Sequence, residues 1–124
     1  MEALDRFYLF WWICIPVRLG IGGAALGITL TRIHALFYLA GALSAAVAIG
    51  FAANVICTVL GCKTRGGLGG RVWWRRARVI HCILWAVCAA LCFTRTYGAG
   101  AILLLDAVLG CIFGLFHFAG NVDL

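Results

Sequence analysis

The sequence predicts an all-α fold, a bundle of four helices that each span a membrane. Three observations support this: apolar residues make up 65% of the 124 residues, charged residues make up only 11%, and the apolar residues fall into four runs. A soluble domain usually carries about 25% charged residues, because its exterior must be polar. This chain cannot supply such an exterior, so we expect 1–124 to form a single integral membrane domain.

A helix needs about 20 mostly apolar residues to cross a bilayer. Three of the four runs reach this length, and the third, from about Val79 to Phe93, is short unless the "WWRRAR" stretch extends its helix. Pro16 and Arg18 interrupt the first run, Asp106 lies in the last, and the second contains no charged residue. Each run must be helical, because a segment surrounded by lipid has to satisfy its own backbone hydrogen bonds. We expect spans at about 7–30, 35–60, 76–93 and 98–118.

The connections between the runs differ in length. The short segments "TRIH" and "TRTYG" predict tight turns between antiparallel helices, whereas "GCKTRGGLGGR" is longer and holds five glycines. We expect 70–78 to form a short interfacial helix before the third span. Small residues should allow close helix packing, through Gly23 and Gly27 in the first span and Gly110 and Gly114 in the last. The second span, small nearly all round, is expected at the centre of the bundle.

The distribution of basic residues predicts the orientation of the chain. Four spans place the N-terminus, the middle connection and the C-terminus on one side of the membrane. That side carries seven Lys and Arg residues, whereas the opposite side carries two, Arg32 and Arg95. The positive-inside rule then places both termini in the cytoplasm. The seven are Arg6, Lys63, Arg65, Arg71, Arg75, Arg76 and Arg78.

Most of these cations form a basic interfacial patch around the start of the third span. On a membrane protein such a patch contacts anionic headgroups, each basic residue contributing about 1 kcal/mol near the surface. Tryptophans are common at the same level. The patch is also expected to dock partner proteins, and the net charge of +6 does not indicate nucleic-acid binding, since no soluble basic face exists. The patch consists of Lys63, Arg65, Arg71, Trp73, Trp74, Arg75, Arg76 and Arg78.

Two charged residues lie deep within the predicted spans, Arg18 in the first and Asp106 in the last. An isolated charge at that depth costs at least about 2.5 to 3.5 kcal/mol. An ion pair between them would reduce this cost and join the first span to the fourth. The pair has two interpretations: a structural clasp, or part of a proton or ion path.

Other residues with chemical potential give weaker signals. His81 and His117 form a possible polar site near the cytoplasmic side, which a cysteine could extend to bind metal, although the spacing does not require it. The seven cysteines are expected to behave as small apolar residues, since no paired zinc-ligand spacing occurs. The chain contains no HExxH, GxSxG or P-loop sequence. We therefore predict no enzyme, no cofactor and no resident metal.

The second half of the chain carries a pattern in which a glycine pair, one further residue and "VWW" follow in order, and "LLLD" is separated by three residues from a glycine. This pattern resembles small multi-span membrane proteins of large double-stranded DNA viruses of eukaryotes. The resemblance implies a structural role in the internal membrane of a virion, where such proteins join the bilayer to minor capsid proteins. The matching positions are Gly66, Gly69, Gly70, Trp73, Trp74, Arg78, His81, Asp106 and Gly110, with "IPVRLGIG" in the first half.

The sequence therefore predicts a structural, multi-pass membrane protein, a virion inner-membrane or minor capsid component. Its partners would be anionic lipid and capsid or other membrane proteins, and self-association is left open. The alternative is a small oligomeric ion channel of the viroporin kind, in which Arg18 and Asp106 would serve conduction rather than packing.

Overall fold

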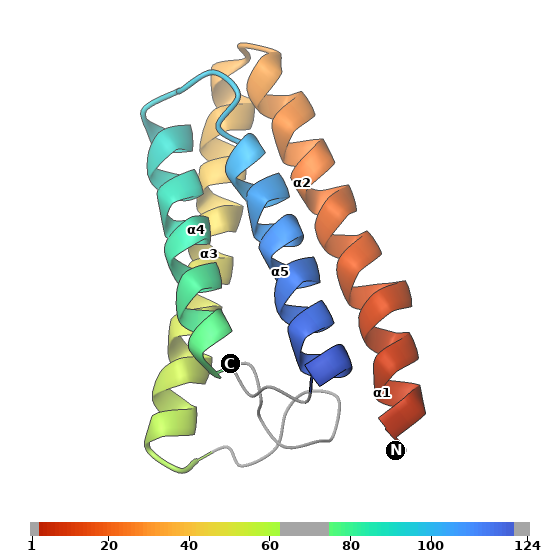
Figure 1. Cartoon of the computed structure of the whole chain (residues 1–124). Helices are drawn as coiled ribbons and strands as arrows, with labels where there is room; N and C mark the ends of the chain where they lie inside the picture. Colours follow the sequence, from red (N-terminus) through yellow and green to blue (C-terminus); the bar gives the residue numbers. More distant parts are fainter. Residues whose placement is uncertain (1–2, 63–74, 121–124) are drawn as a thin grey trace.

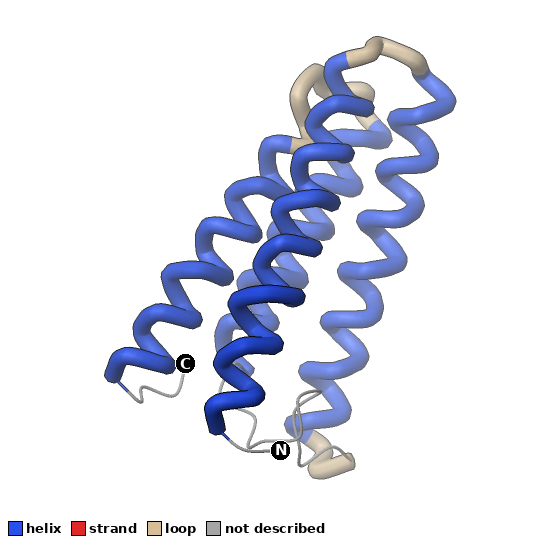
Figure 2. Tube along the Cα trace, turned by 90° about the vertical axis from the view of Figure 1, so that its right-hand side faces the viewer, coloured by secondary structure: helices blue, strands red, loops and turns tan. Residues whose placement is uncertain are grey.

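A computed structural model describes residues 3–62 and 75–120, and the predicted helical bundle is confirmed (Figure 1). Within this part of the chain every regular element is helical, as the tube in Figure 2 shows. The elements are α1 (Ala3–Leu9), the π-helical turn η1 (Phe10–Cys14), α2 (Ile15–Leu30), α3 (His34–Val59), α4 (Arg75–Phe93) and α5 (Ala101–Gly120).

The described residues contain four helices long and apolar enough to cross a membrane. The first of them, Asp5–Leu30, runs through α1, η1 and α2 without a break. The outer surface is apolar along its length, with large side chains such as Trp12, Ile49 and Leu60 exposed. An apolar exterior of this extent is suited to lipid rather than water, so the chain is a multi-pass membrane protein.

The start of α1 and the end of α5 lie at one end of the bundle, and the short connections lie at the other (Figure 1). The turn at 31–33 joins α2 to α3, and the segment 94–100 joins α4 to α5. The described helices therefore alternate in direction, as a chain of four spans requires. This grouping of the helix ends agrees with the predicted arrangement of four antiparallel spans.

The π-helical turn η1 explains how Pro16 is accommodated inside a spanning helix. Proline has no N–H and its ring collides with the carbonyl one turn earlier, so an α-helix cannot continue through it unchanged. Here the chain widens by one residue just before the proline, and the N–H of Ile15 donates to the carbonyl of Phe10. The helix continues beyond this wide turn, so Arg18 lies on a regular part of α2.

Close packing joins α2 to α5 and α3 to α4. A Cβ on Gly22 would lie 2.8 Å from the side chain of Leu104, and one on Gly100 would overlap the backbone of Ala25 and Leu26. Glycine at these two positions therefore lets α2 and the start of α5 approach at backbone distance. On the other side of the bundle, a Cβ on Gly41 would lie 3.1 Å from the side chain of Phe93 and 3.2 Å from that of Cys92, so α3 packs closely against α4 there.

Two expectations about packing are wrong. A Cβ added to Gly23 or Gly27 would meet no atom within 4 Å, so these glycines face outward, whereas Gly110 and Gly114 do pack inside the bundle. Helix α3 is not central: it is the least buried of the four described spans. Its buried residues form one narrow face, and α3 packs mainly against α4. These buried residues are Phe37, Ala40, Gly41, Ser44 and Ala48.

The predicted interfacial helix at 70–78 is corrected in part. Residues 75–78 are the first turn of α4 and continue directly into the span, so they do not form a separate element. The apolar spacing of α4 already begins at Ala77, which is buried. The rest of the predicted element, 70–74, lies outside the described residues.

Candidate intramembrane polar site

One face of α4 carries polar side chains into the centre of the bundle. Its buried residues include Arg78, His81, Trp85, Cys88 and Cys92, which recur at alternating intervals of three and four residues. That spacing keeps all five on one side of a helix. Helix α5 faces them with Asp106, which is only 1% exposed.

Asp106 accepts hydrogen bonds from three side chains on two other helices. Its Oδ2 lies 3.2 Å from Nη1 of Arg18 and 3.2 Å from Nε1 of Trp85. Its Oδ1 accepts from Nδ1 of His81. Both carboxylate oxygens are therefore engaged, which is the condition under which a buried ionised group is tolerated.

The guanidinium of Arg18 also contacts the ring of His81. Nη1 lies 3.2 Å from Nδ1 and 3.3 Å from Nε2, so it sits over the ring face rather than in line with one nitrogen. The Arg18 guanidinium carbon is 5.9 Å from the ring centre of Phe51, which brings α3 into the site. Phe51 and Phe113 lie against the His81 ring from two directions, at 5.9 and 6.1 Å between ring centres.

A glycine makes room for this arrangement. A Cβ on Gly110 would lie 3.3 Å from Nη1 of Arg18, tighter than most side-chain contacts. Gly110 is one turn beyond Asp106 on the same face of α5. The packing of α2 against α5 therefore needs both the carboxylate of Asp106 and a glycine at position 110.

The charges of the site balance, and its hydrogen-bond donors come from the chain itself. The Arg18 cation is offset by the Asp106 anion, which in turn receives donors from His81 and Trp85. The side chain of Arg18 is 20% exposed, whereas those of His81 and Asp106 are almost completely buried. Among the described residues, no group of three or more His, Cys, Asp and Glu is placed to hold a metal. The arrangement is suited to holding three helices in register.

The residues predicted from the sequence are distributed unevenly around this site. Arg18 and Asp106 meet, as the expected ion pair requires. His81 belongs to the same cluster, whereas His117 lies one turn beyond Phe113 and meets the ring of Phe118 edge-on. His81 is therefore a partner of Asp106, and its predicted grouping with His117 stays a prediction.

The basic interfacial patch is described only at its end. Arg75 and Arg76 are exposed at the start of α4. Arg78 is only 3% exposed, so its assignment to a surface patch is wrong. It lies three residues before His81 on the inward face, and its long apolar stem packs inside the bundle. The remaining patch residues, Lys63, Arg65, Arg71, Trp73 and Trp74, lie outside the described residues.

Trp85 is the site residue that sequence reasoning missed. Tryptophan in a span usually lies near the interface, so its residue type alone does not place it in the core. The signal that could have found it is the spacing along α4, where Arg78, His81 and Trp85 share one face. A face on which each residue carries a polar hydrogen indicates an acceptor opposite, and Asp106 is the one acid in a predicted span.

These features define a class: a multi-pass α-helical membrane protein whose spans meet around a buried, fully engaged carboxylate. Comparison with protein-family models, curated proteins and solved structures finds no match. The resemblance to virion membrane proteins accordingly stays a prediction.

Proposed function

We propose that this chain is a structural integral membrane protein, a rigid four-span body that positions partner proteins at a membrane surface. The observation that carries this proposal is the set of three donors on Asp106, which come from α2 and α4 onto α5. A carboxylate that serves transport or catalysis keeps a hydrogen-bonding position open for its substrate. Here both carboxylate oxygens are occupied by the chain's own side chains, which supports a clasp.

The proposed docking face is the end of the bundle that holds both termini. Arg75 and Arg76 are exposed there, at the first turn of α4. In the finer form of the proposal this end faces the cytoplasm or the capsid side of a virion's internal membrane, and the arginines contact acidic segments of minor capsid proteins. Support for the virion form comes from the sequence resemblance alone.

A flux measurement tests the structural role. Purified protein is reconstituted into liposomes loaded with a pH-sensitive dye, and proton and potassium flux are followed after a gradient is applied. The structural proposal expects the same flux as in protein-free liposomes, for both the wild type and Asp106→Asn. Ion-selective flux that Asp106→Asn abolishes would overturn the proposal.

Docking is tested separately, in the membrane or particle from which the protein is isolated. A photoreactive amino acid replaces Arg75, and a matched control carries it at Val108, which is exposed on the side of α5. The proposal expects protein cross-links from position 75 and lipid cross-links from position 108. Lipid alone at both positions would count against a docking role.

A second candidate function, the small oligomeric channel, is favoured by the inward face of α4. This face carries exchangeable hydrogens at successive levels, on Arg78, His81, Trp85, Cys88 and Cys92. Ser44 extends the column by placing its hydroxyl 3.7 Å from Sγ of Cys88. A proton path along this face would give the flux that the liposome measurement detects.

A further inference from the structure

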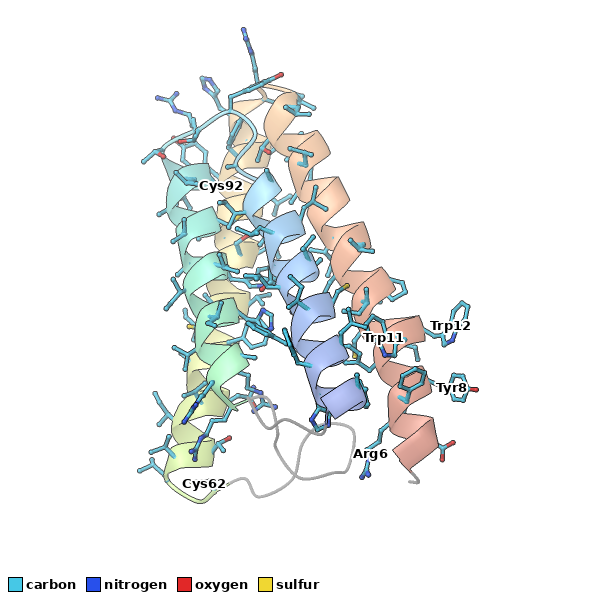
Figure 3. All side chains as sticks on the ribbon, in the orientation of Figure 1. Arg6, Tyr8, Trp11, Trp12, Cys62 and Cys92 are labelled. Carbon is cyan, nitrogen blue, oxygen red and sulfur yellow. The ribbon has the colours of Figure 1, made fainter. Side chains whose placement is uncertain are left out.

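The end of the bundle with the two short connections holds a second group of basic residues. One buried threonine, Thr29, holds these connections together. The carbonyl of Thr29 accepts from the N–H of Gly98 at 3.3 Å, and its Oγ1 accepts from the N–H of Gly100 at 3.0 Å. Thr29 is completely buried. The turn at 31–33 and the segment 94–100 are therefore held against each other, and Figure 3 shows nitrogen-bearing side chains projecting from this end.

Two arginines at this end occupy backbone positions that normally favour glycine. Arg32 has φ 61° and Arg95 has φ 57°, both in the left-handed region. The hydrogen bonds around Arg95, from its own N–H to Cys92 and from Thr96 to Leu91, form the Schellman motif, whose left-handed residue is usually Gly. The end of α3 shows the usual choice, since Gly61 occupies the equivalent position there. Arginine at both positions is a strained choice in backbone terms.

The side chains of these arginines reach across to the opposite connection. The guanidinium carbon of Arg32 lies 5.6 Å from the ring centre of Tyr97. Nη1 of Arg95 lies 3.4 Å from Nδ1 of His34, the first residue of α3. When Nδ1 of His34 accepts this hydrogen bond, the ring hydrogen is on Nε2, which is then a donor that Arg95 does not engage. Both contacts order the cations without neutralising them.

The described residues place no carboxylate at this end. Their two acids are Asp5, in the first turn of α1 at the far end, and Asp106, which is engaged by Arg18. The first turn of α3 adds positive character, because its N-cap residue, Ile33, makes no side-chain cap. The surface therefore presents donors from two guanidiniums and an imidazole, and the acceptor that fits them is a phosphate.

We propose that Arg32, His34 and Arg95 bind the phosphate of an anionic phospholipid headgroup in the leaflet at this end. The spans end here, so the site lies at the depth of lipid phosphates, and Tyr97 is exposed beside it as interfacial aromatics are. Each guanidinium contacts a residue of the other connection or of the helix that follows it, Arg32 at Tyr97 and Arg95 at His34, so both cations are held at this end. This site is separate from the docking face proposed above, which is at the other end of the bundle.

The test places a reporter beside the site in the full-length chain. Meta-fluorotyrosine is incorporated at Tyr97, and its fluorine NMR shift is followed in detergent as phosphatidylglycerol is added. We expect a saturable shift in the wild type. In the double variant Arg32→Gln with Arg95→Gln the apparent Kd should rise about tenfold or more, since charge-assisted hydrogen bonds are lost. The matched control, Arg75→Gln with Arg76→Gln at the opposite end, should titrate like the wild type.

A second variant keeps the proposal testable if the first folds poorly. Arg32→Gly with Arg95→Gly relieves the left-handed backbone, so we expect a higher melting temperature together with the same loss of lipid binding. Unchanged titration in either folded variant, or an equal loss in the control, would overturn the site. Inorganic phosphate alone, titrated in parallel, should shift the resonance only weakly. Binding as tight as that of the lipid would refute the assignment to a headgroup.

Discussion

Asp106 joins α5 to both α2 and α4, because it accepts from Arg18, His81 and Trp85 at once. Its neutralisation leaves a guanidinium without a counter-charge among groups that were arranged for an anion. Breaking a buried pair by removing one partner costs about 3 to 5 kcal/mol.

The first prediction follows for Asp106→Asn. We expect it to lower the free energy of unfolding by about 3 kcal/mol or more, measured by SDS-induced unfolding in mixed micelles. The matched control is Asp5→Asn, in an exposed first turn, which should change stability by less than about 1 kcal/mol. Equal effects of the two substitutions would contradict the importance of the buried site.

A second prediction concerns the donor that the sequence did not reveal. Trp85→Phe keeps an aromatic ring but removes the Nε1–H that donates to Asp106 at 3.2 Å. Hydrogen bonds to charged groups contribute about 1.5 to 3 kcal/mol, so we expect a loss in that range in the same unfolding measurement. Trp12→Phe, on an outward-facing side chain that Figure 3 shows clear of the bundle, should have little effect. A loss below that of Trp12→Phe would mean that the hydrogen bond is not formed.

The site could be predicted from the sequence only as far as charge alone decides it. Arg18 and Asp106 are the two charges deep inside predicted spans. Because an isolated charge in lipid is costly, each is expected to pair with the other. The inclusion of His81 and Trp85 depends on how α4 is rotated about its axis. Rotation is set by packing against α3 and α5, which a single sequence does not display. The same rotation buries Arg78, which charge counting assigns to the surface.

At the scale of elements, the glycines show which helix faces pack against a neighbour and which do not. Gly100 lies so close to Ala25 and Leu26 that a methyl group would overlap main-chain atoms, which cannot move aside as a flexible side chain can. Gly23 and Gly27 face open space. Small residues in a spanning helix therefore predict close packing somewhere, but not on which face.

The third prediction uses this contrast. Gly100→Ala should separate α2 from α5 and lower stability by about 1 to 3 kcal/mol, or more where the backbone cannot relax. Gly23→Ala and Gly27→Ala should be neutral or raise stability by up to about 1 kcal/mol, since alanine is the better helix former. Thermal unfolding in detergent ranks the three variants. Destabilisation by Gly23→Ala as large as that by Gly100→Ala would refute the observed helix faces.

The element boundaries were the most predictable feature, and the reason is physical. Lipid excludes charge and unpaired backbone, so the ends of charge-free runs lie close to the ends of the helices, as with α3 at His34–Val59. The order of neighbours was less accessible. Small residues on every side of α3 indicated a central position, yet most of those faces meet no other helix in the described part of the chain. Small residues show that a helix can be approached closely, but they do not show which faces another helix contacts.

At the scale of the whole molecule, the fold puts the start of α1, the end of α5 and the start of α4 at one end, and both short connections at the other (Figure 1). The positive-inside rule predicts that the end with the termini faces the cytoplasm. Two exposed positions report on the two ends: Cys62 after α3, and Thr96 in the connection before α5.

The fourth prediction is an outcome of cysteine labelling in intact cells. A membrane-impermeant maleimide should label Thr96→Cys before permeabilisation, and Cys62 only after it, with peptide mass spectrometry identifying the modified residue. The reason is that the two positions lie on opposite sides of the bilayer. Labelling of Cys62 in intact cells would place the termini on the outer side and reverse the orientation.

The central claim is that Arg18 and Asp106 stabilise the bundle through each other. A double-mutant cycle tests this most directly, with Arg18→Met, Asp106→Asn and the combined variant unfolded under identical mixed-micelle conditions. We predict a coupling free energy of about 1 to 3 kcal/mol, so that the double variant loses less than the sum of the single losses. Additivity of the two losses to within about 0.3 kcal/mol would contradict the claim, since residues that do not interact give that result.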